Sequence, residues 1–516
     1  MKLSINFVSM IILFSGLVSA LERHDSSSAF KHRRGPLKPR RTSSLLINPD
    51  AQPDLPTAEA ATAAAAAAGL NLDDIQGDVL VGMKKNQELF YFFSIANATD
   101  FKPKLASDIL PLITTTSQLL DVSTQPITAI NIAFSQTGLT SLGVTDALGD
   151  SAFAGGQLKD LKALGDPSST NWVPEFAGTG IHGVILFASD SVDNINSAVS
   201  SLEAALGDSI TKVYSLQAAA RPGAEAGHEH FGFLDGISNP AVSGFTTNPM
   251  PGQSVISAGS ILVGETGDTV TTRPAWAKDG SFLVFRQLQQ LVPEFNKFLT
   301  DNPIIEDGLT AEQGLGAPWR AYGWPLEERM VPPSTSPRSL TTPHSAPTPP
   351  GTTTLPLRTR TRSSPLIRPD APSLLTSVKR VPVPIWVLPK RPYTTSCAQE
   401  FHTGLKYNFS TVSDDEAASS TTSTERGLAF VAYQSNINNG FRFLQQTWAN
   451  SANFVHAGVG LDPVIGALAG AQRVIAGLDP TNSTKTTTLT TDFVVSRGGE
   501  YFFSPSLSAI ASTLSV

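Results

Sequence analysis

The stretch from His230 to Pro240 reads HFGFLDGISNP and holds an acidic residue, Asp235, between two glycines. Glycine permits backbone geometries that other residues avoid, so Gly232 and Gly236 indicate a tight, accessible turn. A carboxylate on such a turn can exchange a proton with a bound molecule, or it can simply cap the turn. From this pattern alone a structural turn is the more common interpretation, and a catalytic role for Asp235 is the alternative.

Composition excludes several classes of protein. The 516 residues carry a formal net charge of −7, and 41% of them are apolar, as expected for a globular protein with a sizeable core. This charge argues against a nucleic-acid partner, since such binding needs a clustered basic surface. Cys397 is the only cysteine, so no intrachain disulfide can form.

The N-terminus predicts export. Lys2 is followed by an apolar run, Ile5 to Leu17, and residues 18–20 (Val-Ser-Ala) form a small-residue cleavage site. The run is shorter than the roughly 20 residues of a membrane span. We therefore expect a signal peptide at 1–20, a secreted, extracellular protein, and no membrane partner after cleavage.

The following residues, 21–69, are interpreted as a pro-segment and linker. They are basic and lack an apolar period, while the alanine run Ala58–Ala68 has helical propensity but no amphipathic stripe. Sequons at Asn97 and Asn482 fit a secreted glycoprotein.

Hydrophobic periodicity predicts two successive sets of strands and helices. The first set comprises strands at Ile75–Met83, Glu88–Ile95, Ala129–Phe134 and Gly183–Ala188, a helical stretch after Gly138, and a helix over Ser191–Leu206. The second comprises strands at Ser257–Val263, Ser281–Phe285, Leu428–Tyr433, Asp492–Ser496 and Tyr501–Ser504, and helices from Arg286 to about Leu299 and through Phe441–Trp448. Their similar order suggests a duplicated α+β unit.

The run around Asp235 resembles the GxxDG signature of the DyP-type (dye-decolorizing) haem peroxidases, including its trailing Ile-Ser-Asn-Pro. Residues 75–80 (IQGDVL) and 424–435 (TERGLAFVAYQS) also resemble that family, in its fungal secreted form. The resemblance covers about 70–319 and 413–516.

The resemblance implies a fold, a cofactor and a reaction. The fold is a pair of ferredoxin-like α+β units, like a dimeric α+β barrel, with helices packed on antiparallel sheets. The N-terminal half would be 70–240, ending in the GxxDG motif, and the C-terminal half, 241–516, would bind haem b. Hydrogen peroxide would then oxidise bulky phenolic or dye-like donors, with Asp235 taking a proton from peroxide and returning it to the leaving oxygen. The oligomeric state is left open.

Further cofactor-binding candidates are Gly232, Leu428, Phe430 and Arg286. Leu428 and Phe430 are two apart on an expected strand and so share a face, which suits either a haem-pocket wall or ordinary core packing. Arg286 could pair with a haem propionate or form a structural ion pair. His228 and His230 are interpreted as polar neighbours of the turn rather than metal ligands.

The segment 322–409 departs from the family pattern. It is crowded with Pro, Thr, Ser and Arg and has no apolar period, although the family draws its proximal histidine and distal arginine from this interval. Codons compatible with Pro372 to Arg380 can spell Cys-Pro-Phe-Ala-Ala-His-Ile-Arg-Lys in another register, which is family-like. A frame-shifted reading is therefore favoured over a disordered insertion.

The departure leaves the metal ligand unassigned. His344, His402 and His456 are substitutes in principle, and Asp462 is either a carboxylate that orients an axial histidine or a helix cap. The alternative functions are an inactive haem-binding relative and a mistranslated chain that lacks both residues.

Overall fold

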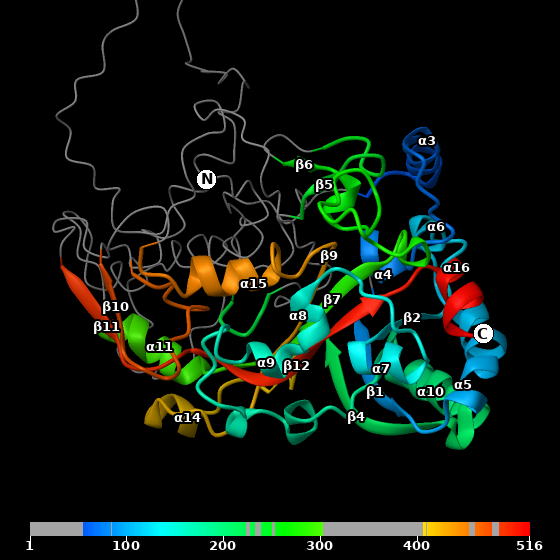
Figure 1. Ribbon diagram of the computed structural model, residues 1–516. Coiled ribbons are helices and arrows are strands. Elements are labelled where there is room, and N and C mark those ends of the chain that lie inside the picture. The colour runs from blue at the N-terminus through cyan, green and yellow to red at the C-terminus, as the bar shows by residue number, and fades with distance from the viewer. Residues whose placement is uncertain are drawn as a thin grey trace, which may run out of the picture.

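The computed structural model describes residues 55–83, 85–222, 228–232, 239–249, 253–302, 406–408, 410–453, 460–476 and 485–516 (Figure 1). Eight of the strands close into a barrel in which every pair is antiparallel. In barrel order they are β1 (Gln87–Ile95), β3 (Gly183–Ser189), β2 (Thr128–Phe134), β12 (Val494–Ser504), β7 (Ser281–Gln290), β9 (Gly427–Gln434), β8 (Lys406–Tyr407) and β4 (Ile210–Ala219).

The barrel consists of two halves with the same strand order. Within each half the order is fourth, first, third, second, namely β4-β1-β3-β2 and β12-β7-β9-β8. The halves meet where Phe503 of β12 pairs with Phe134 of β2, and where Ala219 of β4 pairs with Lys406 of β8. The predicted α+β class and its duplicated antiparallel units are therefore confirmed.

Helices and short strands complete the described part of the chain. The helices are α3 (Ala58–Ala68), α4 (Gly77–Leu80), α5 (Ala98–Lys104), α6 (Thr116–Leu120), α7 (Gln136–Ser141), α8 (Ser151–Gly155), α9 (Gln157–Asp160), α10 (Val192–Leu206), α11 (Val292–Asp301), α14 (Asp414–Ser419), α15 (Phe441–Phe443) and α16 (Leu507–Ala509). Two small sheets pair β5 (Ala241–Val242) with β6 (Val255–Ile256), and β10 (Arg473–Ala476) with β11 (Thr486–Leu489). No helix in these described ranges is long and apolar enough to cross a membrane.

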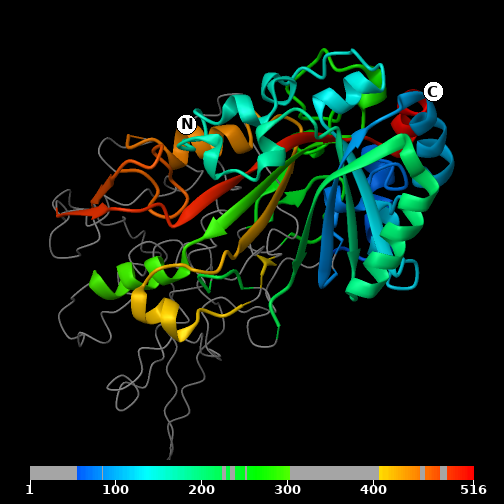
Figure 2. The same ribbon diagram turned by 90° about the horizontal axis from the view of Figure 1, so that it is seen from below.

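Alternating side chains divide the core into two layers. Inside the barrel, rings from both halves meet, with Phe92 lying 4.9 Å from Phe285 and 6.1 Å from Phe502 between centroids. Outside the first half, α10 packs through Ile195 and three further buried side chains at helical spacing. Figure 2 shows this helix along the outer side of the first half's strands. The predicted helix over Ser191–Leu206 is thus confirmed, with Ser191 as its N-cap.

Two expected strands are wrong. Within Ile75–Met83 the chain forms α4, because the Gln76 side chain bonds Ile132 of β2 at both its N–H and its C=O and fixes a turn there. Within Ser257–Val263 it forms a 3₁₀ turn, Ala258–Ser260. Short apolar runs of this kind do not distinguish a strand from a buried turn.

The boundary at Arg286 is also wrong, as is the predicted strand pair near the C-terminus. Strand β7 continues through Arg286 to Gln290, since β9 and β12 pair with it on both sides, and α11 begins at Val292 with Pro293 in its first turn. Residues 494–504 form the single strand β12, which carries a bulge between Ser496 and Gly499.

The alanine run is not a linker. It forms α3, which is capped by Thr57 and ends before Gly69, whose φ is 77°. Ala61 and Ala65 of this helix are buried in an apolar cluster that includes side chains of the barrel strands. Small side chains allow this close approach without an amphipathic stripe of large ones. Strand β4 was not predicted at all, because its burial pattern is irregular.

Candidate active site

The outer face of the second half holds three of the predicted site residues. Arg286 of β7 lies opposite Phe430 of β9, and Leu288 lies opposite Leu428. Because side chains alternate along a strand, Arg286, Leu428 and Phe430 project to the same side of the sheet. The expectation that Leu428 and Phe430 share a face agrees with this register, and each is 8% exposed.

Arg286 makes a buried ion pair. Its Nη2 donates to Asp166 Oδ2 and to Ser496 Oγ, both at 2.5 Å, and the guanidinium lies 5.8 Å from the Phe441 ring centroid. Arg286 is 3% and Asp166 5% exposed. The Nε of Arg286 is buried and has no hydrogen-bond partner among the described residues. The ion-pair alternative is thus realised, while one donor remains for another acceptor.

The segment that leads into the GxxDG motif is attached to the same half-barrel. The Gln290 side chain, at the end of β7, donates to the Glu229 carboxylate and accepts from His230 N–H at 3.4 Å. Gly232 N–H donates to Glu229 O at 2.9 Å and closes a turn, and Gly232 has φ 101°. That φ favours glycine, as the sequence predicted. Asp235 lies outside the described residues.

His230 is a buried neutral histidine. It is 8% exposed, and its Nε2 lies 3.4 Å from the Tyr407 carbonyl oxygen. Burial, with a smaller contribution from the charge of Arg221, lowers the pKa of His230 to about 3. Within the described part of the chain no cluster of three or more His, Cys, Asp or Glu residues could hold a metal ion. His344, His402 and His456 lie outside the described residues, as does Cys397.

An apolar cluster joins the turn to the C-terminal segments. The Phe231 ring lies 4.3 Å from that of Phe295 in α11, and Val464 and Phe493 complete the group with other buried side chains. Asp462 Oδ1 accepts from the N–H groups of Val464 and Ile465, both at 3.0 Å. Asp462 therefore caps a turn that starts at Pro463, and the helix expected after this cap is not formed in residues 463–472. A role of Asp462 in orienting an axial histidine stays a prediction.

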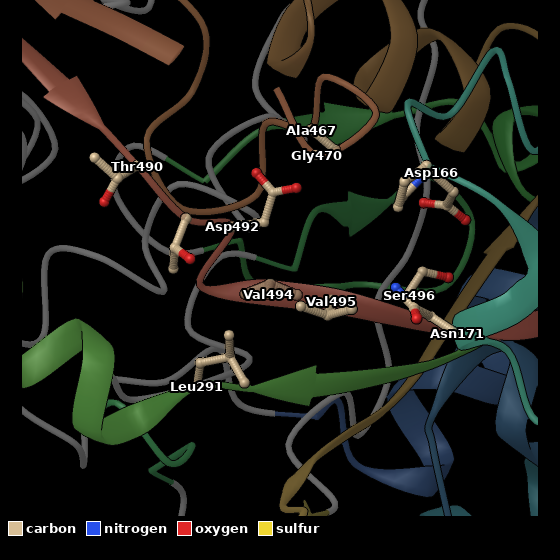
Figure 3. A pocket seen from close by; sticks show the side chains of 12 residues that line it. Asp166, Asn171, Leu291, Ala467, Gly470, Thr490, Asp492, Val494, Val495 and Ser496 are labelled. Atoms are coloured by element: carbon tan, nitrogen blue, oxygen red, sulfur yellow. The ribbon is translucent and has the colours of Figure 1, made fainter. Parts of the chain in front are cut away.

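Sequence reasoning did not identify Asp166 or Ser496 as part of this face. Asp166 lies in the loop after α9 and Ser496 in β12, 330 residues further along the chain. Figure 3 shows both side chains beside a cavity. Only tertiary pairing brings them to Arg286, so no local motif marks them.

Comparisons with known proteins agree with this architecture. Residues 74–222 match the family described as the DyP dimeric alpha+beta barrel domain. Peroxidase 2 of Mycetinis scorodonius is 52% identical over 93% of this chain and 94% of its own. Dye-decolorizing peroxidase AauDyP1 of Auricularia auricula-judae is 46% identical over 92% of each chain.

A solved structure extends the match to three dimensions. The crystal structure of AauDyP complexed with imidazole aligns with a TM-score of 0.72 and 44% identity, covering 86% of this chain and all of that one. The chain therefore belongs to the dye-decolorizing (DyP-type) peroxidase family and is a haem peroxidase.

Proposed function

We propose that this protein is a secreted peroxidase that uses hydrogen peroxide to oxidise bulky phenolic or dye-like compounds, with haem b bound on the outer face of the second half. The observation that carries the proposal is the register of β7 and β9. It gathers Arg286, Leu428 and Phe430 on one face, while Gln290 ties the turn at Gly232 to the same strand.

The residues on this face fit a flat, largely apolar group with acidic substituents. Leu428 and Phe430 offer an apolar wall, and Arg286 retains a buried Nε without a partner in the described ranges. When bound, haem supplies the iron at which peroxide is cleaved. Arg286 would hold a propionate, and Leu428 and Phe430 would limit access to the peroxide side.

Asp235 is proposed as the acid–base residue. Asp235 follows the turn closed at Gly232 in the sequence, and its carboxylate would accept a proton from peroxide and return it to the departing oxygen. The same carboxylate must lose its proton before each turnover.

Replacing Asp235 by Asn tests this role. Asn keeps the size and removes the proton-accepting group, so the first peroxide-dependent absorbance change should slow by roughly 10²-fold or more. The haem absorbance of the resting protein should be retained. Asp208→Asn, the same change at an exposed carboxylate of the N-terminal half, is the control. Unchanged peroxide kinetics in Asp235→Asn would make Asp235 a turn cap.

A further inference from the structure

A cavity of about 210 Å³ opens beside β12, next to the Arg286 ion pair (Figure 3). Its apolar lining includes Leu291, Val494 and Val495. Asp166 and Asp492 lie on two sides of it, from the loop after α9 and from the residues before β12. The cavity thus combines an apolar floor with two carboxylates.

Its size selects a class of ligand. A cavity of about 150 Å³ accommodates a benzene ring, whereas sites for drug-sized molecules span about 300–1,000 Å³. About 210 Å³ therefore holds one substituted aromatic ring and excludes a polycyclic dye.

The charged residues that line the cavity further restrict the ligands that it can bind. Asp166 and Asp492 line the cavity, whereas their partners Arg286 and Arg473 do not, and the side chains of both arginines are almost fully buried. Burial raises the pKa of Asp492 above its usual range. Asn171, Thr490, Thr491 and Ser496 can donate as well as accept hydrogen bonds, but the two carboxylates are the charged groups among the described lining residues. This charge favours phenols and protonated amines over anions.

The cavity is also connected to the proposed haem face. Asp166 and Ser496 line it, and both contact Arg286. The Arg286 guanidinium lies over the Phe441 ring, whose centroid is 5.7 Å from that of Phe430. A ring held in the cavity is therefore joined by a short series of packed side chains to the wall of that face.

We propose that this cavity is a second donor site, which binds single-ring phenols that bear no negative charge and passes their electrons to the peroxide-oxidised enzyme. In one step the phenol loses an electron to that oxidised enzyme and its hydroxyl proton to the Asp492 carboxylate, and it leaves as a phenoxyl radical. Larger dyes must donate elsewhere. The proposed binding of phenols does not depend on the proposed function, whereas the proposed electron transfer does.

Binding can be measured on the full chain without turnover. Calorimetric titration should show one site for tyramine, a single-ring phenol with an ammonium group. No site should appear for 3-(4-hydroxyphenyl)propionate, the matched anion. Asp492→Asn should weaken tyramine binding by about tenfold, a typical loss for one charge-assisted hydrogen bond.

A second variant keeps the binding test interpretable if Asp492→Asn disturbs the fold. Arg473 also donates to the carbonyl oxygens of Asp462, Gly466 and Thr491, which keep it anchored in Asp492→Asn. Val495→Phe fills the cavity without changing charge and should abolish tyramine binding, while Asp208→Asn should bind as the parent does. Equal binding of the two phenols, or tyramine binding that neither cavity variant alters, would overturn the site.

Turnover separates this site from the proposed function. In an active enzyme, Asp492→Asn should raise KM for tyramine relative to KM for a bulky sulfonated anthraquinone dye. An unchanged ratio refutes the electron-transfer step. Tyramine binding as described, in a protein without any peroxide-dependent oxidation, would refute the proposed function and support the site.

Discussion

A buried carboxylate inside the barrel, Asp78, is expected to make the folded protein less stable at neutral pH than at pH 4. Asp78 of α4 is 2% exposed and accepts from the Tyr433 hydroxyl at 2.7 Å. Burial raises its pKa from 3.8 to about 6, against the opposing effect of the Tyr433 hydrogen bond. Glu88 lies in the same interior, and burial followed by the charge of Asp78 raises its pKa as well.

The direction of this pH dependence of stability follows from proton binding. A pKa that is higher in the folded state means that folding takes up a proton, so stability falls as pH rises from about 4 to about 6 and then levels off. The rise from 3.8 to about 6 corresponds to about 3 kcal/mol, since one pKa unit is worth about 1.4 kcal/mol. Asp78→Asn removes the titration but retains an oxygen that can accept from Tyr433. At pH 7 the variant should therefore be more stable than the parent by up to about 3 kcal/mol.

Scanning calorimetry at one scan rate, from pH 4 to pH 8, measures this difference. A change of 1 kcal/mol shifts Tm by about 2–4 °C in domains of 150–250 residues, so a shift of several degrees is expected at pH 7. At pH 4 the two proteins should melt at similar temperatures, and Asp208→Asn should follow the parent throughout. A constant gap at every pH would show that Asp78 does not titrate in this range, and a less stable variant at pH 7 would show that its charge is stabilising.

Three further predictions concern the candidate site. Asp166→Asn should destabilise the protein by about 3–5 kcal/mol, because it leaves the buried Arg286 unpaired, whereas the Asp166→Leu/Arg286→Met double variant should recover most of that loss in the same calorimetric assay. His230→Gln should retain its haem absorbance and its pH–rate profile between pH 4 and pH 8, since His230 is already neutral there; loss of haem would identify it as an iron ligand. Sequencing the transcript across codons 320–412 should restore a histidine and an arginine codon in the shifted register, and confirmation of the present frame would favour the inactive relative.

The sequence predicted those features that local patterns encode. The helical spacing of Ile195, Val199 and Leu202 placed α10, and the glycines around Asp235 placed a turn at Gly232. Strand β7 shows where such patterns stop. Arg286, Gln287 and Gln290 are polar, so the apolar run ends at Phe285, yet hydrogen bonds from β9 and β12 extend the strand to Gln290. There, pairing with strands more than a hundred residues away in the sequence outweighs the low strand propensity of the polar residues.

The contacts within the candidate site could not be predicted from the sequence for the same reason. Nothing near Asp166 indicates that its carboxylate will neutralise Arg286, since the two are 120 residues apart. Phe430 could be placed on a strand face from its spacing with Leu428, but its position opposite Arg286 needs the register of β7 and β9. Residue identity thus indicated which side chains matter, and tertiary pairing determines what they contact.

The two halves share a strand order but differ on their outer faces, and this difference supports the proposal that haem binds to the second half. On the first half, β1 presents Leu89, Tyr91, Phe93 and Ile95 to the helices, and all four belong to one apolar cluster with α5 and α10. The equivalent strand β7 presents Phe282, Val284 and Leu288 to that cluster, but Arg286 and Gln290 on the same face are polar.

This difference has a physical consequence. The apolar side chains of the first half need no hydrogen-bond partners and can be covered by close helix packing. The Tyr91 hydroxyl donates to Glu203 of α10 at 2.9 Å. Arg286 and Gln290 require acceptors and donors, which Asp166, Ser496 and Glu229 provide in part. Because these partners come from loops and from the neighbouring strand β12 rather than from a helix laid on the sheet, the second half leaves a cavity beside β12 and an unsatisfied Arg286 Nε in the described ranges. The polar residues along β7 therefore distinguish the proposed binding face of the second half from the packed face of the first.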